Sequence, residues 1–118
     1  MNNKVKGTAF ERKMCNILSR NGYWVHFISP DNSGAQPFDI IAVKSGMAIA
    51  ADCKTCVDDT FRIGRLEDNQ IMAFERWVAC GNLDPVIFVE HDKNIYLIPY
   101  NDLKEKRGVK LDEHYRWK

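Results

Sequence analysis

The chain has 118 residues, of which 45% are hydrophobic and 28% are charged, so length and composition predict one globular domain over residues 1–118. A net charge of +1 excludes a protein that binds nucleic acid through overall positive charge alone. The chain has no apolar run near the ~20 residues of a membrane span and no apolar N-terminal signal, so we expect a cytoplasmic protein without a membrane partner.

The four cysteines do not form a zinc-binding pattern. Cys53-x-x-Cys56 is a single pair, and neither Cys15 nor Cys80 belongs to a second pair at zinc-ribbon spacing. We therefore interpret the cysteines as reduced, buried or half-buried thiols.

The first predicted element is a helix over residues 8–21. Apolar residues recur in it at three- and four-residue spacing, namely Phe10, Met14, Ile17 and Leu18. Glu11 falls on the edge of this apolar stripe. Thr8-x-x-Glu11 also fits a capping box, in which Glu11 bonds to the backbone of Thr8. The segment alone therefore leaves open both a capping role and a catalytic role for Glu11.

An aromatic and β-branched run at residues 23–29 predicts a strand. Residues 30–37 are rich in turn formers and predict a loop that ends beside Asp39. Ser33 and Gln36 in this loop are candidates for contacts with phosphate, and a plain connection between strands is the alternative.

A hairpin follows the loop. Its two strands, residues 38–43 and 47–54, are apolar on successive positions, as expected for strands covered on both faces. A tight turn at Ser45-Gly46 separates them. A two-residue turn fixes a register in which Asp39 lies opposite Asp52.

This register brings charged side chains together at the end of an apolar hairpin. Lys54 shares a face of its strand with Asp52, two residues away. Two acids about 5 Å apart destabilise a sheet unless a positive group lies between them. A hard cation that prefers oxygen ligands is the simplest such group.

Beyond the hairpin the sequence predicts a loop that extends the second strand, a second helix, two strands, a short helix and a basic, partly mobile tail. These elements cover residues 56–66, 67–80, 85–90, 94–99, 101–106 and 107–118, in that order. The element order α-β-β-β-α-β-β predicts an α/β fold with a single mixed β-sheet flanked by helices. Residues 115–118 of the tail fit either a disordered end or a segment whose aromatic side chains stack on unpaired bases.

A glutamate on the first helix, an aspartate that opens an apolar strand, and Asp-x-Lys on the next strand together resemble the PD-(D/E)xK nuclease superfamily. The resemblance rests on Gly7-x-x-x-Glu11, Pro37-Phe38-Asp39-Ile40-Ile41, Ala51-Asp52-Cys53-Lys54-Thr55 and Asn69-Gln70. Within the superfamily the layout is similar to the small Holliday junction resolvases, both the archaeal type and the RecU type of Gram-positive bacteria and their phages. The resemblance implies a restriction-endonuclease-like fold.

The same resemblance implies Mg²⁺-assisted hydrolysis of phosphodiesters by water, with Mn²⁺ as a substitute. The implied catalytic residues are Glu11, Asp39, Asp52, Lys54 and Gln70, and the implied metal ligands are Asp39, Asp52, Glu11 and the carbonyl oxygen of Cys53. Lys54 would orient the nucleophile and stabilise the charged transition state, and Gln70 would position water. The predicted DNA contacts are Lys4, Lys6, Arg12, Ser33, Arg62 and Arg65.

The implied partner is branched DNA, most of all the four-way junction, which the protein would cut during recombination in a bacterium or a phage-infected host cell without a small organic cofactor. Symmetric incision of a four-way junction needs two active sites related by a two-fold axis, which implies a homodimer. Two alternatives stay open, a restriction- or repair-type nuclease acting on linear DNA and a non-catalytic DNA-binding module.

Overall fold

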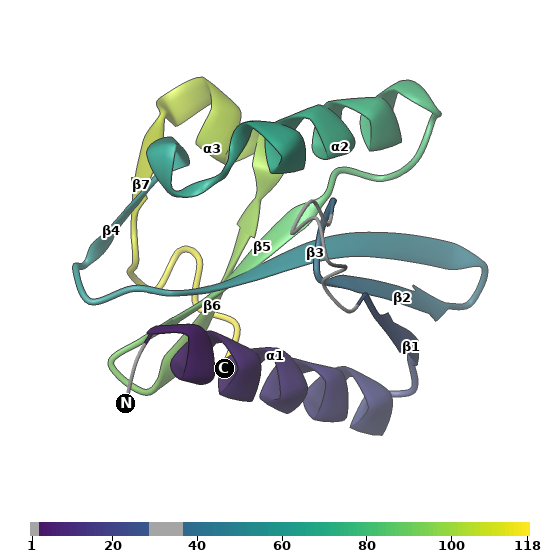
Figure 1. The fold of residues 1–118 in the computed structure, drawn as a ribbon, viewed down its shortest axis with the longest axis horizontal. Coiled ribbons are helices and arrows are strands. Elements are labelled where there is room, and N and C mark those ends of the chain that lie inside the picture. Colours follow the sequence, from purple (N-terminus) through teal and green to yellow (C-terminus); the bar gives the residue numbers. More distant parts are fainter. Residues whose placement is uncertain (1–2, 29–36) are drawn as a thin grey trace.

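The computed structural model describes residues 3–28 and 37–118, with side chains from residue 9 onward. The fold is a mixed β-sheet between two layers of helices (Figure 1). The predicted fold class, α/β with a mixed sheet flanked by helices, is therefore confirmed. A second, two-stranded sheet accompanies the main one and was not predicted.

Helix α1 (Asn3–Arg20) begins at Asn3 rather than at Thr8. Thr8 consequently lies inside the helix and not at its N-cap, which removes the capping-box explanation of Glu11. Strand β1 (Trp24–Phe27) follows and is shorter than the predicted run.

Strands β2 (Ile40–Lys44) and β3 (Met47–Thr55) form the predicted antiparallel hairpin. Both turn residues have positive φ, 54° at Ser45 and 77° at Gly46, as a two-residue hairpin turn of the primed type requires. Lys44 pairs with Met47 and Ile40 with Ala51. This is the predicted register, and Asp39 stands one residue before its first paired position.

The segment after β3 contains a strand where the sequence predicts a loop. Strand β4 (Thr60–Arg62) and the short 3-10 helix η1 (Ile63–Arg65) lead into helix α2 (Asp68–Ala79). After α2 the chain returns as strand β5 (Val86–His91), which lies parallel to β3. The crossover from β3 to β5 therefore places the start of α2 over the charged end of the hairpin.

Strand β6 (Asn94–Pro99), helix α3 (Tyr100–Lys106) and strand β7 (Gly108–Lys110) complete the fold. The main sheet has the strand order β1-β2-β3-β5-β6, and β4 pairs with β7 in the second sheet. Local periodicity could not predict β4, because its partner strand lies more than forty residues away in the sequence.

Residues 111–118 pack against the main sheet. Tyr115 is 8% exposed, and the N–H of Leu97 donates to its carbonyl oxygen at 2.9 Å. Ile95 exchanges backbone hydrogen bonds with Trp117 and Lys118 at 2.8–3.0 Å, so these residues cover the outer edge of β6. This packing contradicts the predicted mobile tail, and it also contradicts stacking of the Tyr115 ring on unpaired bases.

The two faces of the main sheet bury separate apolar clusters. Helix α1 covers one face and helices α2 and α3 cover the other (Figure 1). Phe10, Met14 and Leu18 pack on the α1 side, whereas Phe74 and Leu103 pack on the α2 side. No helix within residues 3–28 and 37–118 has the length and apolar character to cross a bilayer.

Candidate active site

Asp52 lies at the centre of the charged group. It is on β3, faces α2, and is 0% exposed. Its Oδ1 accepts a hydrogen bond from Nε2 of Gln70 at 3.0 Å. Its Oδ2 lies 3.3 Å from Nζ of Lys54, yet no donor among the described residues forms a hydrogen bond with it. One oxygen of a fully buried carboxylate is thus left without a hydrogen bond.

Asp39 lies beside Asp52 and is held by its surroundings. Its N–H donates to the carbonyl of Ala51 at 3.0 Å, and its own carbonyl accepts from Ile28 at 2.8 Å. Its carboxylate oxygen Oδ2 accepts from the N–H of Cys53 at 2.8 Å. The side chain is 4% exposed, so Asp39 is a buried acid fixed by both neighbouring strands.

The two acids influence each other directly. Burial raises the pKa of Asp52 well above its usual value, and the close approach and negative charge of Asp39 raise it further, while Lys54 lowers it. Two carboxyl groups in such close contact repel each other unless one of them carries a proton. A cation between them would remove this need, because it stabilises both ionised forms.

Lys54 and Gln70 belong to the same network. Lys54 lies 3.4 Å from Oε1 of Gln70, and its side chain is 18% exposed. Oε1 of Gln70 also accepts from the N–H of Glu67 at 3.0 Å. Gln70 is 6% exposed, so its amide is occupied by protein groups on both sides and is not directed at solvent.

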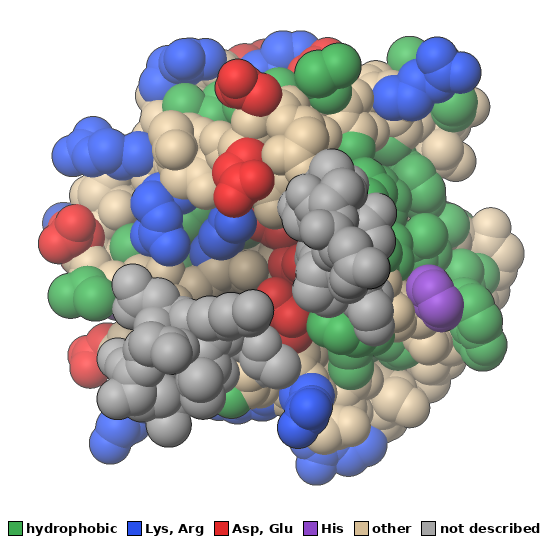
Figure 2. Space-filling view, in the orientation of Figure 1, with side chains coloured by type: hydrophobic (Ala, Val, Ile, Leu, Met, Phe, Trp, Pro, Cys, Tyr) green, Lys and Arg blue, Asp and Glu red, His purple; other side chains and the backbone are tan. Residues whose placement is uncertain are grey.

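Glu11 approaches the acids from the opposite face of the sheet. It is partly buried on α1. Burial, followed by the negative charge of Asp39, raises its pKa from 4.5 to about 7, and Lys54 opposes this rise. Glu11 is thus close enough to interact with both residues. Figure 2 shows acidic side chains gathered at the middle of one face of the molecule, with Lys and Arg side chains next to them.

The donor set fits a hard cation only in part. No group of three Asp, Glu, His or Cys residues within the described part of the chain has the geometry to hold a metal ion, so Glu11 does not complete a cluster with the two aspartates. The contact between Asp39 and Asp52, together with the unbonded Oδ2, is what an oxygen-coordinated cation requires. Cys53 contributes backbone atoms alone, because burial and the nearby acids raise the pKa of its thiol.

The predicted DNA contacts are scattered. Arg12 is exposed on α1 next to Glu11, and Arg62 is exposed on β4. Arg65 donates from Nη2 to the carbonyl of Thr55 at 2.8 Å, just beyond Lys54. Ser33 and Gln36, and the side chains of Lys4 and Lys6, lie outside the described residues.

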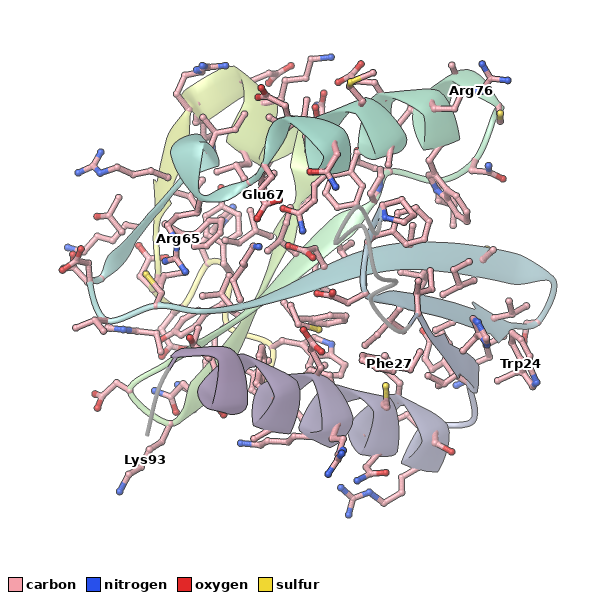
Figure 3. All side chains as sticks on the ribbon, viewed as in Figure 1. Trp24, Phe27, Arg65, Glu67, Arg76 and Lys93 are labelled. Carbon is pink, nitrogen blue, oxygen red and sulfur yellow. The ribbon has the colours of Figure 1, made fainter. Side chains whose placement is uncertain are left out.

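One residue of the network was missed by the sequence analysis. Glu67 is the N-cap of α2, and its side chain accepts from the backbone of Gln70 while the Gln70 side chain accepts from Glu67. The pattern Glu67-x-x-Gln70 is a signal for such a reciprocal cap. Figure 3 shows Arg65 and Glu67 at the start of α2, on the side that faces β3.

The chain is similar to known proteins in both sequence and fold. The sequence matches the family described as archaeal Holliday junction resolvase (Hjc) over residues 2–115. The structure is similar to that of Hjc, a Holliday junction resolvase from the archaeal hyperthermophile Archaeoglobus fulgidus, with a TM-score of 0.65 and 18% sequence identity over 91% of this chain and 87% of that chain. At this identity the likeness to Hjc concerns the fold alone. A comparison with curated protein sequences gave no significant match.

Proposed function

The chain belongs to the archaeal Holliday junction resolvase family, and on that premise we propose that Asp39, Asp52 and Lys54 form the centre at which it hydrolyses DNA. Family membership confirms the resemblance drawn from the sequence. It identifies the chain as a metal-dependent, structure-specific nuclease that acts on DNA junctions in recombination. The residues that perform this reaction, the metal and the assembly are our proposal.

The observation that carries the proposal is the buried pair of acids. Asp52 is 0% exposed and its Oδ2 has no hydrogen bond among the described residues, although Asp39 and Lys54 lie beside it. Mg²⁺, or Mn²⁺ in its place, would be held by Asp39, Asp52 and the carbonyl oxygen of Cys53, and when bound would activate water and neutralise charge on the attacked phosphate.

Three side chains around this pair of acids, those of Lys54, Glu11 and Gln70, have separate roles in the proposed reaction. Lys54 stabilises the negative charge that develops on the phosphate, and Oε1 of Gln70 directs its ammonium group toward the acids. Glu11, with a pKa of about 7, hydrogen-bonds the attacking water and can accept its proton near neutral pH. Gln70 is assigned to orienting Asp52 and Lys54, because both ends of its amide are already occupied.

Arg12 and Arg65 flank the site and are proposed to bind phosphates next to the scissile bond. Arg12 follows Glu11 on α1 and is exposed. Arg65 is anchored to the carbonyl of Thr55, one residue from Lys54. An arginine whose position is fixed by a backbone contact loses little conformational entropy when it binds phosphate.

The substrate is proposed to be a four-way junction in the cytoplasm of a bacterium or a phage-infected host cell, rather than linear DNA. A restriction- or repair-type nuclease of the same fold is the alternative. Purified protein would be incubated with labelled junction, flap, duplex and single-stranded DNA, with Mg²⁺ added or withheld. We expect cleavage of the junction that depends on Mg²⁺. Preferential cleavage of linear duplex would overturn the junction assignment.

Variants of Asp52 and Lys54 distinguish a role in cleavage from a role in folding. Asp52→Asn and Lys54→Ala should abolish cleavage while junction binding and the circular dichroism spectrum stay close to those of the wild type. Lys93→Ala, in the turn between β5 and β6 and outside the site, is the control for loss of a lysine. Wild-type cleavage rates in either site variant would contradict the proposed centre, and failure of all proteins to cleave would favour a non-catalytic DNA-binding module.

Two active sites related by a two-fold axis imply a homodimer. The candidate surfaces for its interface are the exposed face of α2 and the last strand of the main sheet, β6, whose outer edge is already covered by residues 115–118. We therefore place the interface where hydrophobic side chains gather over the end of α2 and the β1–β2–β3 region, on the right of Figure 2. Exposed large hydrophobic residues of these segments are Trp24, Met47, Val78 and Leu83.

Sedimentation with and without junction DNA tests the homodimer. Wild type should sediment as a dimer, and Trp24→Ala with Leu83→Asp should shift it toward monomer. Val57→Ser is a matched control, because Val57 is 94% exposed and lies outside this surface. A wild type that is monomeric under all conditions would overturn the proposed assembly.

A further inference from the structure

The two-stranded sheet presents a basic outer face. Phe61 and Val109, at 0% and 4% exposure, point from β4 and β7 into the core. Side chains alternate along strands, so Arg62 and Lys110 project from the opposite face, where both are exposed. Arg62 pairs with Gly108 across the ladder. Because Gly108 has no side chain, this outer face is flat beside the guanidinium.

A third basic residue adjoins these two. Arg107 ends α3 and precedes β7, and its carbonyl accepts from the N–H of Ile63 at 3.0 Å. Arg107 is therefore held next to the residue that follows Arg62. We call Arg62, Arg107 and Lys110 the basic sheet face. The sequence separates these residues into two distant segments, and the pairing of β4 with β7 unites them.

None of the three residues of the basic sheet face has an ion-pair partner within residues 9–28 and 37–118. Asp59 and Asp112 lie at the end of the small sheet where Lys110 pairs with Thr60, and the N–H of Leu111 donates there to the carbonyl of Asp59 at 2.7 Å. Arg62 and Arg107 lie at the other end, which continues into η1 and α2.

The basic sheet face is continuous with the active site. Thr55 is the last residue of β3, directly before the connection to β4, and its carbonyl accepts a hydrogen bond from Arg65. Arg65 lies between Arg62 and the start of α2, on the side of the molecule that Figure 3 shows facing β3. A DNA strand that leaves the acids past Lys54 and Arg65 therefore meets Arg62 next.

We propose that the basic sheet face binds the phosphate backbone of one duplex arm of the junction, beside the scissile bond. This inference rests on the proposed function and adds Arg107 and Lys110 to the DNA-binding surface. Arg62 and Lys110 are diagonal neighbours of an antiparallel pair, roughly 7–8 Å apart at the backbone, a separation that suits two successive phosphates of one strand. Contacts of this kind hold the arm without reading its sequence.

Binding measurements without divalent metal test the inference independently of cleavage. The affinity of wild type and of the Arg62→Gln/Lys110→Gln variant for a labelled four-way junction is measured by fluorescence anisotropy over a series of salt concentrations. Loss of two phosphate contacts should lower the slope of log K against log salt by about 2 and the affinity by about tenfold at 0.1 M salt. A linear duplex should show the same change, because the face contacts an arm and not the crossover.

A matched control removes the same charge elsewhere. Figure 3 shows Arg76 at the far end of α2 and Lys93 on the opposite side of the sheet. Arg76→Gln/Lys93→Gln should leave slope and affinity within error of wild type, and Arg62→Lys/Lys110→Arg should retain binding. Equal losses in the two glutamine variants, or no loss in either, would overturn the inference. Absence of Mg²⁺-dependent cleavage by wild type, by contrast, would count against the proposed function and leave these binding results unchanged.

Discussion

Gln70 ties the start of α2 to the buried acid Asp52, with Nε2 of the glutamine 3.0 Å from Oδ1 of the aspartate. The other end of the same amide closes the helix cap at Glu67. Because the cap fixes which end of the amide is the oxygen, the NH₂ group must face Asp52. Oδ1 is thereby occupied, and Oδ2, which lies 3.3 Å from Nζ of Lys54, is the oxygen that the proposed metal would use.

Replacing Gln70 with methionine should therefore weaken metal use as well as the fold. Methionine fills a similar volume but leaves Asp52 Oδ1 without its donor, which costs about 1–3 kcal/mol of unfolding free energy. Groups that orient a metal ligand typically contribute about 10–100-fold to metal affinity or activity. The measurement is the Mg²⁺ concentration for half-maximal cleavage, together with urea unfolding.

Gln70→Glu serves as the matched control for this prediction. The glutamate retains an oxygen for the cap at Glu67 but presents a second negative charge to Asp52. It should keep more of the helix stability than the methionine variant and yet cleave no better. If the methionine variant loses stability alone, with an unchanged Mg²⁺ requirement, then Gln70 is a structural cap and does not position Asp52.

The hairpin and the identity of the acids could be predicted from sequence because both are local or periodic. A two-residue turn fixes the register by counting, so the approach of Asp39 to Asp52 followed from Ser45-Gly46. The link between Gln70 and Asp52 could not be predicted in the same way, because it depends on how far α2 is displaced along β3 during the crossover. Gln70 lies one turn before Phe74 and so shares its side of α2, but the sequence did not identify its partner.

The packing of the C-terminal segment could not be predicted from the sequence for a different reason. Its basic, aromatic composition is also that of a mobile end, and nothing local reveals that Tyr115 fills a gap in the core. Strand β7 likewise has three residues, too few for a periodic signal. The packing of Tyr115 and the formation of β7 both depend on pairing between distant segments of the chain. The basic sheet face, which needs β7, could therefore not be predicted, whereas the fold class could be predicted from the order of the elements.

The raised pKa of Glu11 predicts that stability falls with increasing pH. The folded state holds the proton up to a pH of about 7, whereas the unfolded chain releases it near 4.5. Between these values the folded state binds more protons, so the free energy of unfolding decreases as the pH rises through this window. Solvent screening of a partly exposed side chain limits the effect to about 1 kcal/mol. The pKa of Asp52 is also raised and acts in the same direction.

Urea unfolding at pH 5 and pH 7.5 in a metal chelator measures this effect. Glu11→Gln should flatten the difference between the two pH values, while Glu105→Gln, an exposed acid on α3, should not. An identical pH dependence in wild type and Glu11→Gln would show that Glu11 does not titrate in this window.

Arg107 adopts a backbone conformation that favours glycine, with φ at 67° and ψ at −13°. The left-handed region costs a non-glycine residue about 1–2 kcal/mol, part of which glycine gives back through its greater freedom in the unfolded chain. Arg107→Gly should therefore raise the free energy of unfolding by about 0.5–1 kcal/mol and at the same time weaken junction binding. Arg107→Ala should weaken binding without the gain in stability, so a glycine variant no more stable than the alanine variant would show that the backbone is not strained there.

Removing residues 113–118 should destabilise the fold and not merely change DNA affinity. The deletion removes the buried ring of Tyr115 and the contact between Trp117 and Phe88, whose ring centroids lie 5.1 Å apart. Loss of one large aromatic side chain from a core typically costs about 3–5 kcal/mol, and the deletion also exposes the edge of β6, which favours aggregation. Thermal unfolding and light scattering of the truncated protein measure both effects.

Point variants separate the ring of Tyr115 from its hydroxyl group. The hydroxyl donates to Oδ2 of Asp102 at 3.1 Å and accepts from Nζ of Lys106 at 3.0 Å, so Tyr115→Phe should cost about 1 kcal/mol and Tyr115→Ala about 3–5 kcal/mol. Both variants keep the basic residues of the segment. If the truncated protein unfolds like the wild type and loses only junction affinity, the segment is a DNA-binding end and its packing against β6 contributes little to stability.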